Sequence, residues 1–173
     1  MLSDAFLEVI FRNIPECLIF IFSGYAFSRY KLQWKPYLIS VSILALVGYA
    51  IARLLPVEFG ISQILVIITC TALLTIINHL PLQKAIGSAL GVMILGFITD
   101  IIAVIITAIV KGLDIKSILT NRELFNSIFT SNAEQLKYGA ISLAIMTIVL
   151  VSIYLIAKKN GKLKDVPVGK DIE

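Results

Sequence analysis

The apolar residues of this chain gather in blocks of about 20 consecutive positions, and no other feature of the sequence constrains the fold as strongly. Such a block spans a bilayer as a helix, whereas the apolar positions of a soluble helix recur every three or four residues. Composition agrees, because 58% of the residues are hydrophobic and 15% are charged, whereas about a quarter of the residues in a soluble domain are charged. The sequence therefore predicts an all-α, polytopic membrane helical bundle.

Five segments have the length and apolar character of a transmembrane helix. They cover residues 6–27, 37–55, 61–80, 85–110 and 138–157. Pro15 predicts a kink in the first segment, and Pro56 and Pro81 follow the ends of the second and third. We therefore expect residues 1–157 to form one transmembrane domain of about five helices.

Two polar stretches flank the last segment. Residues 111–137 form the only long loop, where apolar residues at rough helical spacing predict an amphipathic helix on the membrane surface. Residues 158–173 are polar and basic, and we expect them to be a disordered cytoplasmic tail.

Lysine and arginine residues are distributed unevenly between the two sides of the membrane. Arg29, Lys31 and Lys35 follow the first segment, Lys84 precedes the fourth, and further lysines lie in the tail. Because cytoplasmic loops carry the excess of cations, the pattern predicts a multi-pass cell-membrane protein with its N-terminus outside and its C-terminus in the cytoplasm. The same placement explains the net charge of +4 without a nucleic-acid partner.

Ionisable residues at bilayer depth are the strongest functional indicators in the sequence. They are Arg12, Glu16, Arg53 and Asp100. Asp100 lies inside the fourth segment, about 15 Å from its outer end at 1.5 Å per residue. A carboxyl group at that depth is protonated, paired, or faces a wet cavity. We expect either structural ion pairs, for example between Arg12 and Glu16, or a ligand or ion site formed by these residues in the outer half of the membrane.

Gly87 and Gly91 form a G-x-x-x-G pattern in the fourth segment. Small residues at this spacing let another helix approach closely. The pattern predicts packing against a neighbouring helix, with homodimerisation through the same face as the alternative.

The residues that catalysis needs are missing or too far apart. His79 is the only histidine of the sequence, and one histidine cannot form a zinc site. Cys70 lies about 13 Å from His79 along one helix, which is too far for a nucleophile and its base. Cys17 and Cys70 lie in apolar segments and are predicted to be small buried residues. The sequence predicts no enzyme, cofactor or metal.

Three short stretches resemble a known family. They are Ile14-Pro15-Glu16, Arg53-Leu54-Leu55-Pro56-Val57-Glu58-Phe59-Gly60 and Leu80-Pro81-Leu82-Gln83-Lys84-Ala85-Ile86. Across roughly residues 5–110, the chain is similar to the N-terminal membrane region of GHKL-type sensor histidine kinases, and of related stand-alone membrane proteins, from low-GC Gram-positive bacteria. In that family a dimerisation helix and an ATP-binding domain follow on the cytoplasmic side. Here only 16 residues follow Ala157, without a phosphoacceptor histidine or a nucleotide-binding segment. The resemblance implies signalling, by a stand-alone module or by part of a longer sensor.

Three functions are consistent with these patterns. The first is a bacterial sensory or regulatory membrane module that lacks a catalytic domain and acts on a cytoplasmic signalling partner. The second is a small-solute transporter component, such as a substrate-binding subunit that works with a partner membrane subunit. The third is a structural membrane scaffold whose only partner is the lipid bilayer. Binding of a small solute that is lost on Asp100→Asn would favour the second.

Overall fold

The computed structural model describes residues 13–54, 59–112 and 132–166, which form five α-helices and no strand. The helices are α2 (Ile14–Ser28), α3 (Trp34–Leu54), α4 (Phe59–Ile76), α5 (Leu82–Val110) and α8 (Asn132–Lys159). The prediction of an all-α helical bundle is confirmed. The first 12 residues, most of the predicted surface loop and the end of the tail lie outside the described residues.

The helices have the dimensions and surface of a membrane protein. Three are long and apolar enough to cross a bilayer: Trp34–Ile51, Leu82–Val110 and Tyr138–Lys159. Ile14–Ser28 and Ile61–Ile76 are shorter apolar helices. Large aliphatic side chains cover the outside, and Leu46, Ile76 and Val110 are each at least 70% exposed. Such a continuous apolar exterior suits lipid as the solvent, whereas a water-soluble protein rarely exposes patches of this extent.

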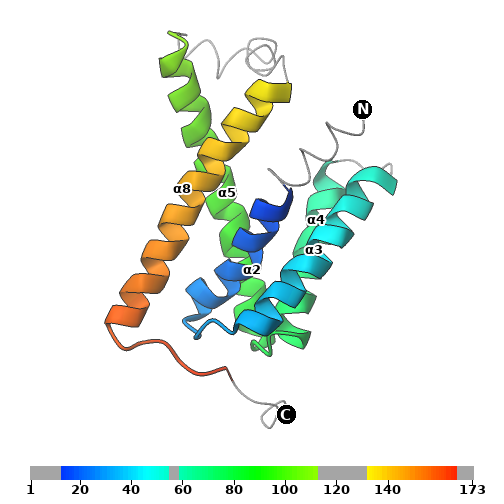
Figure 1. Ribbon diagram of the computed structural model, residues 1–173, viewed down its shortest axis with the longest axis vertical. Coiled ribbons are helices and arrows are strands. Elements are labelled where there is room, and N and C mark those ends of the chain that lie inside the picture. Colours follow the sequence, from blue (N-terminus) through cyan, green and yellow to red (C-terminus); the bar gives the residue numbers. More distant parts are fainter. Residues whose placement is uncertain (1–12, 55–58, 113–131, 167–173) are drawn as a thin grey trace.

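Helix α2 lies between two pairs of helices. It has α3 and α4 on one side and α5 and α8 on the other, and it packs against all four (Figure 1). Helix α5 also packs against α4 and α8. Pro15 lies in the first turn of α2, where its missing N–H breaks no helical hydrogen bond. The helix expected before Pro15 lies outside the described residues.

Among the cationic side chains that the structure describes, all but Lys111 lie at one end of the bundle, which we call the basic end. It contains the last turn of α2, the first turns of α3 and α5, and the last turn of α8 (Figure 1). Its exposed cations are Arg29, Lys31, Lys35, Lys84, Lys158, Lys159, Lys162 and Lys164. The opposite end contains the start of α2 and α8 and the last turns of α3 and α5.

A buried hydrogen-bond network joins three helices near the basic end. The Tyr25 hydroxyl donates to Oδ1 of Asn78 (2.6 Å), and Nδ2 of Asn78 donates to Oγ of Ser40 (2.7 Å) and to the carbonyl of Leu73 (2.9 Å). All three side chains are completely buried. Asn78 lies just after α4, and its bonds to Leu73 help to end that helix at Ile76, before residue 80 where the sequence predicts its end. Because unsatisfied polar groups are costly in lipid, these bonds hold α2, α3 and α4 in one arrangement.

The structure describes the chain after α8 as far as Val166, within the segment 158–173 that the sequence predicts to be a disordered tail. Gly161 adopts a left-handed φ of +62°, which turns the chain at the end of α8. The Lys31 N–H then donates to the Lys164 carbonyl (2.9 Å), and the Lys164 N–H donates to the Arg29 carbonyl (2.9 Å). Val166 is 5% exposed and belongs to the hydrophobic core. We call this pairing of Lys162–Val166 with the loop Arg29–Leu32 the C-terminal clasp. Core packing and backbone pairing order the segment, and neither is visible in its polar composition.

Candidate functional site

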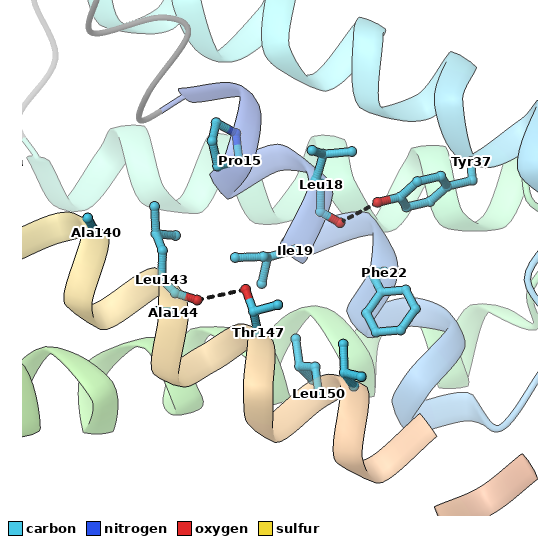
Figure 2. Close-up of a pocket in the computed structure, with 11 residues that line it drawn as sticks. Pro15, Leu18, Ile19, Phe22, Tyr37, Ala140, Leu143, Ala144, Thr147 and Leu150 are labelled. Carbon is cyan, nitrogen blue, oxygen red and sulfur yellow. Dashed lines mark hydrogen bonds between the residues drawn. The ribbon is translucent and has the colours of Figure 1, made fainter. Parts of the chain in front are cut away.

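An apolar groove of about 520 Å³ runs between α2, α3 and α8. Figure 2 shows its walls, which come from sequence positions more than 100 residues apart. The lining residues are Pro15, Leu18, Ile19 and Phe22 of α2, Tyr37 of α3, and Ala140, Leu143, Ala144, Thr147, Leu150 and Val151 of α8. A volume of this size lies within the usual range for sites that bind small molecules.

The groove lies beside the shortest helix of the described part of the chain. Helix α2 has 15 residues, whereas α3 has 21 and α8 has 28. Both long helices pack against α2, and they make no extensive contact with each other in the described part of the chain. The groove lies between them, along Pro15–Phe22 of α2.

The α8 wall of the groove carries small and β-branched side chains in one stripe. Ala140, Ala144, Thr147 and Val151 are spaced four, three and four residues apart, which places them on one face of the helix. All four are exposed. An occupant can therefore approach close to the backbone of α8 along about three turns.

The polar side chains of the lining are already engaged. The Tyr37 hydroxyl donates to the Leu18 carbonyl (3.1 Å), and the Thr147 hydroxyl donates to the Leu143 carbonyl (2.7 Å); both bonds are drawn in Figure 2. The lining that the structure describes thus offers hydrocarbon surface and no charged group. This chemistry suits an apolar occupant such as a lipid chain or a hydrophobic helix.

A second set of contacts, the α5–α8 polar seam, lies on the other side of α8. The Ser142 hydroxyl donates to Oδ1 of Asp100 (2.7 Å) and lies 3.0 Å from Oγ1 of Thr99. The Tyr138 hydroxyl donates to the main-chain carbonyl of Asp100 (2.9 Å). Thr99 and Ser142 are buried, whereas the side chain of Asp100 is exposed.

The structure describes the side chains of two of the four residues predicted to form a ligand site, Glu16 and Asp100. Arg12 lies outside the described residues, and Arg53 lies in the last turn of α3, where only the backbone is described. Glu16 lies in the first turn of α2 and is half-buried. Asp100 lies on α5, which packs against α2, α4 and α8, whereas α3 packs against α2 and α4. The joint site of these residues stays a prediction.

Ser142 is the site residue that the sequence interpretation missed. It interrupts the apolar fifth segment four residues after Tyr138, so that both hydroxyls share a helix face. A search for hydroxyls on that face opposite Asp100 would have found it.

The two glycines of the G-x-x-x-G pattern have different surroundings. A Cβ atom at Gly91 would lie 3.2 Å from the ring of Phe27, so the absence of a side chain lets α2 approach α5 closely. A Cβ atom at Gly87 would have no neighbour within 4 Å.

Helix α8 takes part in three features at once. It forms one wall of the groove, contributes Ser142 to the polar seam and ends at the C-terminal clasp. No protein-family model, curated protein or solved structure matches the chain.

Proposed function

We propose that this membrane protein is a sensory or regulatory module without a catalytic domain, in which α8 transmits occupancy of the groove to the C-terminal clasp. The observation that carries the proposal is the course of α8, from the groove wall at Ala140–Val151 to the clasp at its end. The resemblance to the membrane region of sensor kinases supports the same class of function.

The basic end faces the cytoplasm in this proposal. The concentration of lysine and arginine there is typical of the inner side of a membrane. The clasp would then be presented to a cytoplasmic partner, while the groove lies between the basic end and the opposite side.

Helix α8 connects the groove wall to the C-terminal clasp, and these two parts differ in rigidity. Within the bilayer, α8 is a continuous helix from Asn132 to Lys159, so a displacement of its groove wall also displaces its last turn. The clasp is a short contact that consists of two backbone hydrogen bonds, the packing of Val166, and an ion pair of 2.8 Å between Lys31 and Asp165, whose side chains are 57% and 82% exposed. Exposed ion pairs contribute little to stability, so two backbone bonds and one apolar side chain hold the clasp, and it yields before the helix bends.

An occupant that enters the groove pushes α8 away from α2 and α3. The groove-lining residues of α8 would be displaced outward, and the last turn of α8 would move relative to the loop Arg29–Leu32. The Tyr154 hydroxyl, which accepts the Leu32 N–H (3.0 Å), lies on the same path. Opening of the clasp would release Lys162–Val166 toward a partner.

A bulky substitution can mimic the occupant. We expect Ala144→Trp to fill the groove and to shift the distance between spin labels at Lys35 and Lys158, which lie exposed at the basic ends of α3 and α8. The measurement is pulsed electron paramagnetic resonance on the full chain in lipid nanodiscs, with the buried Cys17 and Cys70 replaced by alanine.

Ser152→Trp is the matched control, because Ser152 is exposed on α8 and does not line the groove. It should leave the distance distribution unchanged. An unchanged distribution with Ala144→Trp, in protein that retains its helicity, would refute the coupling of groove and clasp.

A further inference from the structure

The carboxyl group of Asp100 lies on a lipid-facing surface. Its neighbours Phe97, Ile98 and Ile101 are 50–57% exposed, and the side chain of Asp100 is exposed among them. Asp100 is 18 residues from Leu82 and 10 from Val110 (100 − 82 and 110 − 100), which corresponds to about 27 Å and 15 Å along the helix. It therefore lies within the membrane-crossing helix, in the half away from the basic end.

The hydrogen bonds of this carboxyl group are incomplete. Oδ1 accepts one bond, from Ser142, whereas an ionised carboxylate has sites for about four. The Tyr138 hydroxyl donates to the main-chain carbonyl of Asp100. Among the described residues Asp100 forms no ion pair. A carboxyl group at this depth without a cationic partner is costly in lipid, which favours a partner that covers it.

We propose that Asp100 and the α5–α8 polar seam bind a transmembrane helix of another protein that carries one arginine or lysine at matching depth. A basic side chain supplies the missing charge and several N–H donors to the free lone pairs. The inference does not depend on the coupling of groove and clasp, because the seam and the groove are on different sides of α8.

The backbone next to Asp100 is accessible to such a helix. Gly96 precedes Asp100 by four residues and so lies on the same face of α5. A Cβ atom at Gly96 would have no neighbour within 4 Å. A partner helix can therefore approach the backbone of α5 one turn from the carboxyl group.

A second copy of this chain is the less suitable occupant. A symmetric dimer brings the same patch of both copies together, and it would place Asp100 against Asp100. Two carboxylates in a low-dielectric interface repel each other. A cation alone is also a poor occupant, because the described residues contain no cluster of three metal-ligating side chains.

The test uses the full chain in phospholipid vesicles and a synthetic polyleucine transmembrane helix with a single arginine. Association is measured by Förster transfer between a fluorophore on the helix and one at Lys162 of the chain. We compare helices with the arginine in the outer third, with the arginine in the inner third, and with leucine only. We expect the outer-third arginine to associate about tenfold more tightly than the other two.

Charge reversal separates recognition from a structural effect. Asp100→Leu should abolish the preference for the outer-third arginine, and Asp100→Lys should transfer it to a helix with a glutamate at the same position. Asp100→Asn preserves the shape of the side chain and a hydrogen bond to Ser142. If Asp100→Lys does not insert into the membrane, Asp100→Asn serves instead and should reduce the preference for the outer-third arginine several-fold. Equal association of all three helices with the wild-type chain would overturn the proposal. Self-association that is lost on Asp100→Asn would overturn it in favour of a second copy.

Discussion

The two halves of this bundle satisfy their polar groups in different ways. Toward the basic end, Tyr25, Asn78 and Ser40 bond to one another across three helices, and the hydroxyls of Ser28 and Ser88 lie 3.1 Å apart between α2 and α5. Toward the opposite end, the groove extends to Pro15 and Ala140, and the carboxyl group of Asp100 has a single hydroxyl donor among the described residues. In the described part of the chain, side chains close the first half, whereas the second leaves apolar volume and a carboxyl group accessible.

This difference separates folding from binding. A membrane helix gains little from burial against other helices, since lipid is as apolar as leucine, so hydrogen bonds and close packing decide the arrangement. The closed half supplies both and fixes the order of the helices. The open half can then take up an apolar occupant or a partner helix without disturbing the bonds that define the fold.

The largest expected effect is at Asn78. Asn78→Leu introduces an apolar side chain of similar size and leaves the hydroxyls of Tyr25 and Ser40 without their partner in the closed half. Because a buried unsatisfied group costs about 1–3 kcal/mol, we expect a loss of about 2–3 kcal/mol in the free energy of unfolding. Denaturation in mixed detergent micelles measures it. Gln83→Ala, at an exposed position nearby, should change the free energy by less than about 0.5 kcal/mol; equal losses would contradict the assignment.

The next largest effect on the free energy of unfolding comes from a glycine-to-alanine substitution, which we compare between the two halves. A Cβ atom at Gly24 would overlap the side chain of Leu74, which is completely buried and cannot move aside freely. We expect Gly24→Ala to lower the free energy of unfolding by about 1–3 kcal/mol through overpacking. Gly96→Ala, where a Cβ atom meets open space, should be neutral or stabilising by up to about 1 kcal/mol because alanine favours the helix. The same unfolding assay tests both variants. A loss of stability with Gly96→Ala as large as that with Gly24→Ala would show that the surroundings of Gly96 are as tightly packed as those of Gly24.

The helices themselves could be predicted from the sequence, because apolar blocks of membrane-spanning length leave the backbone no alternative to helix in lipid. The burial of Cys17 and Cys70 is also confirmed. The positions of the helices and of these cysteines along the chain follow from hydropathy, which can be read from each short stretch of sequence by itself.

The contacts between distant residues could not be predicted. Asn78 meets Ser40 and Tyr25 across 38 and 53 residues, and Ser142 meets Asp100 across 42. Serine and threonine are common in transmembrane helices and usually bond to their own helix, as Thr147 does here. The pairing depends on the rotation of each helix about its axis, which apolar blocks without a polar face do not specify. The clasp was missed for a related reason, because a short polar segment is ordered by backbone pairing that its composition does not encode.

A smaller effect is expected at the polar seam of the open half. Ser142→Ala removes the donor to Asp100 and the partner of Thr99. Hydrogen bonds between transmembrane helices contribute about 0.6 kcal/mol on average, so we expect a loss of about 0.5–1 kcal/mol in the free energy of unfolding. Thr147→Val, which removes a bond within α8 alone, is the matched control and should cost less. A loss at Ser142 as large as that at Asn78 would show that the seam, too, is part of what fixes the fold.

The smallest effect is expected at the clasp, where the ion pair between Lys31 and Asp165 lies in solvent. Asp165→Asn removes the charge and keeps the shape, and exposed pairs contribute about 0–1 kcal/mol that salt screens further. We expect the free energy of unfolding to fall by less than about 0.5 kcal/mol at low ionic strength, and the difference to vanish in molar salt. Val166→Ser tests the other component, because Val166 is 5% exposed, and hydrogen exchange at the Lys164 amide should rise more with this variant than with Asp165→Asn. The reverse order would mean that the ion pair holds the clasp more than Val166 does, and would make its opening sensitive to salt and to acidic partners at the basic end.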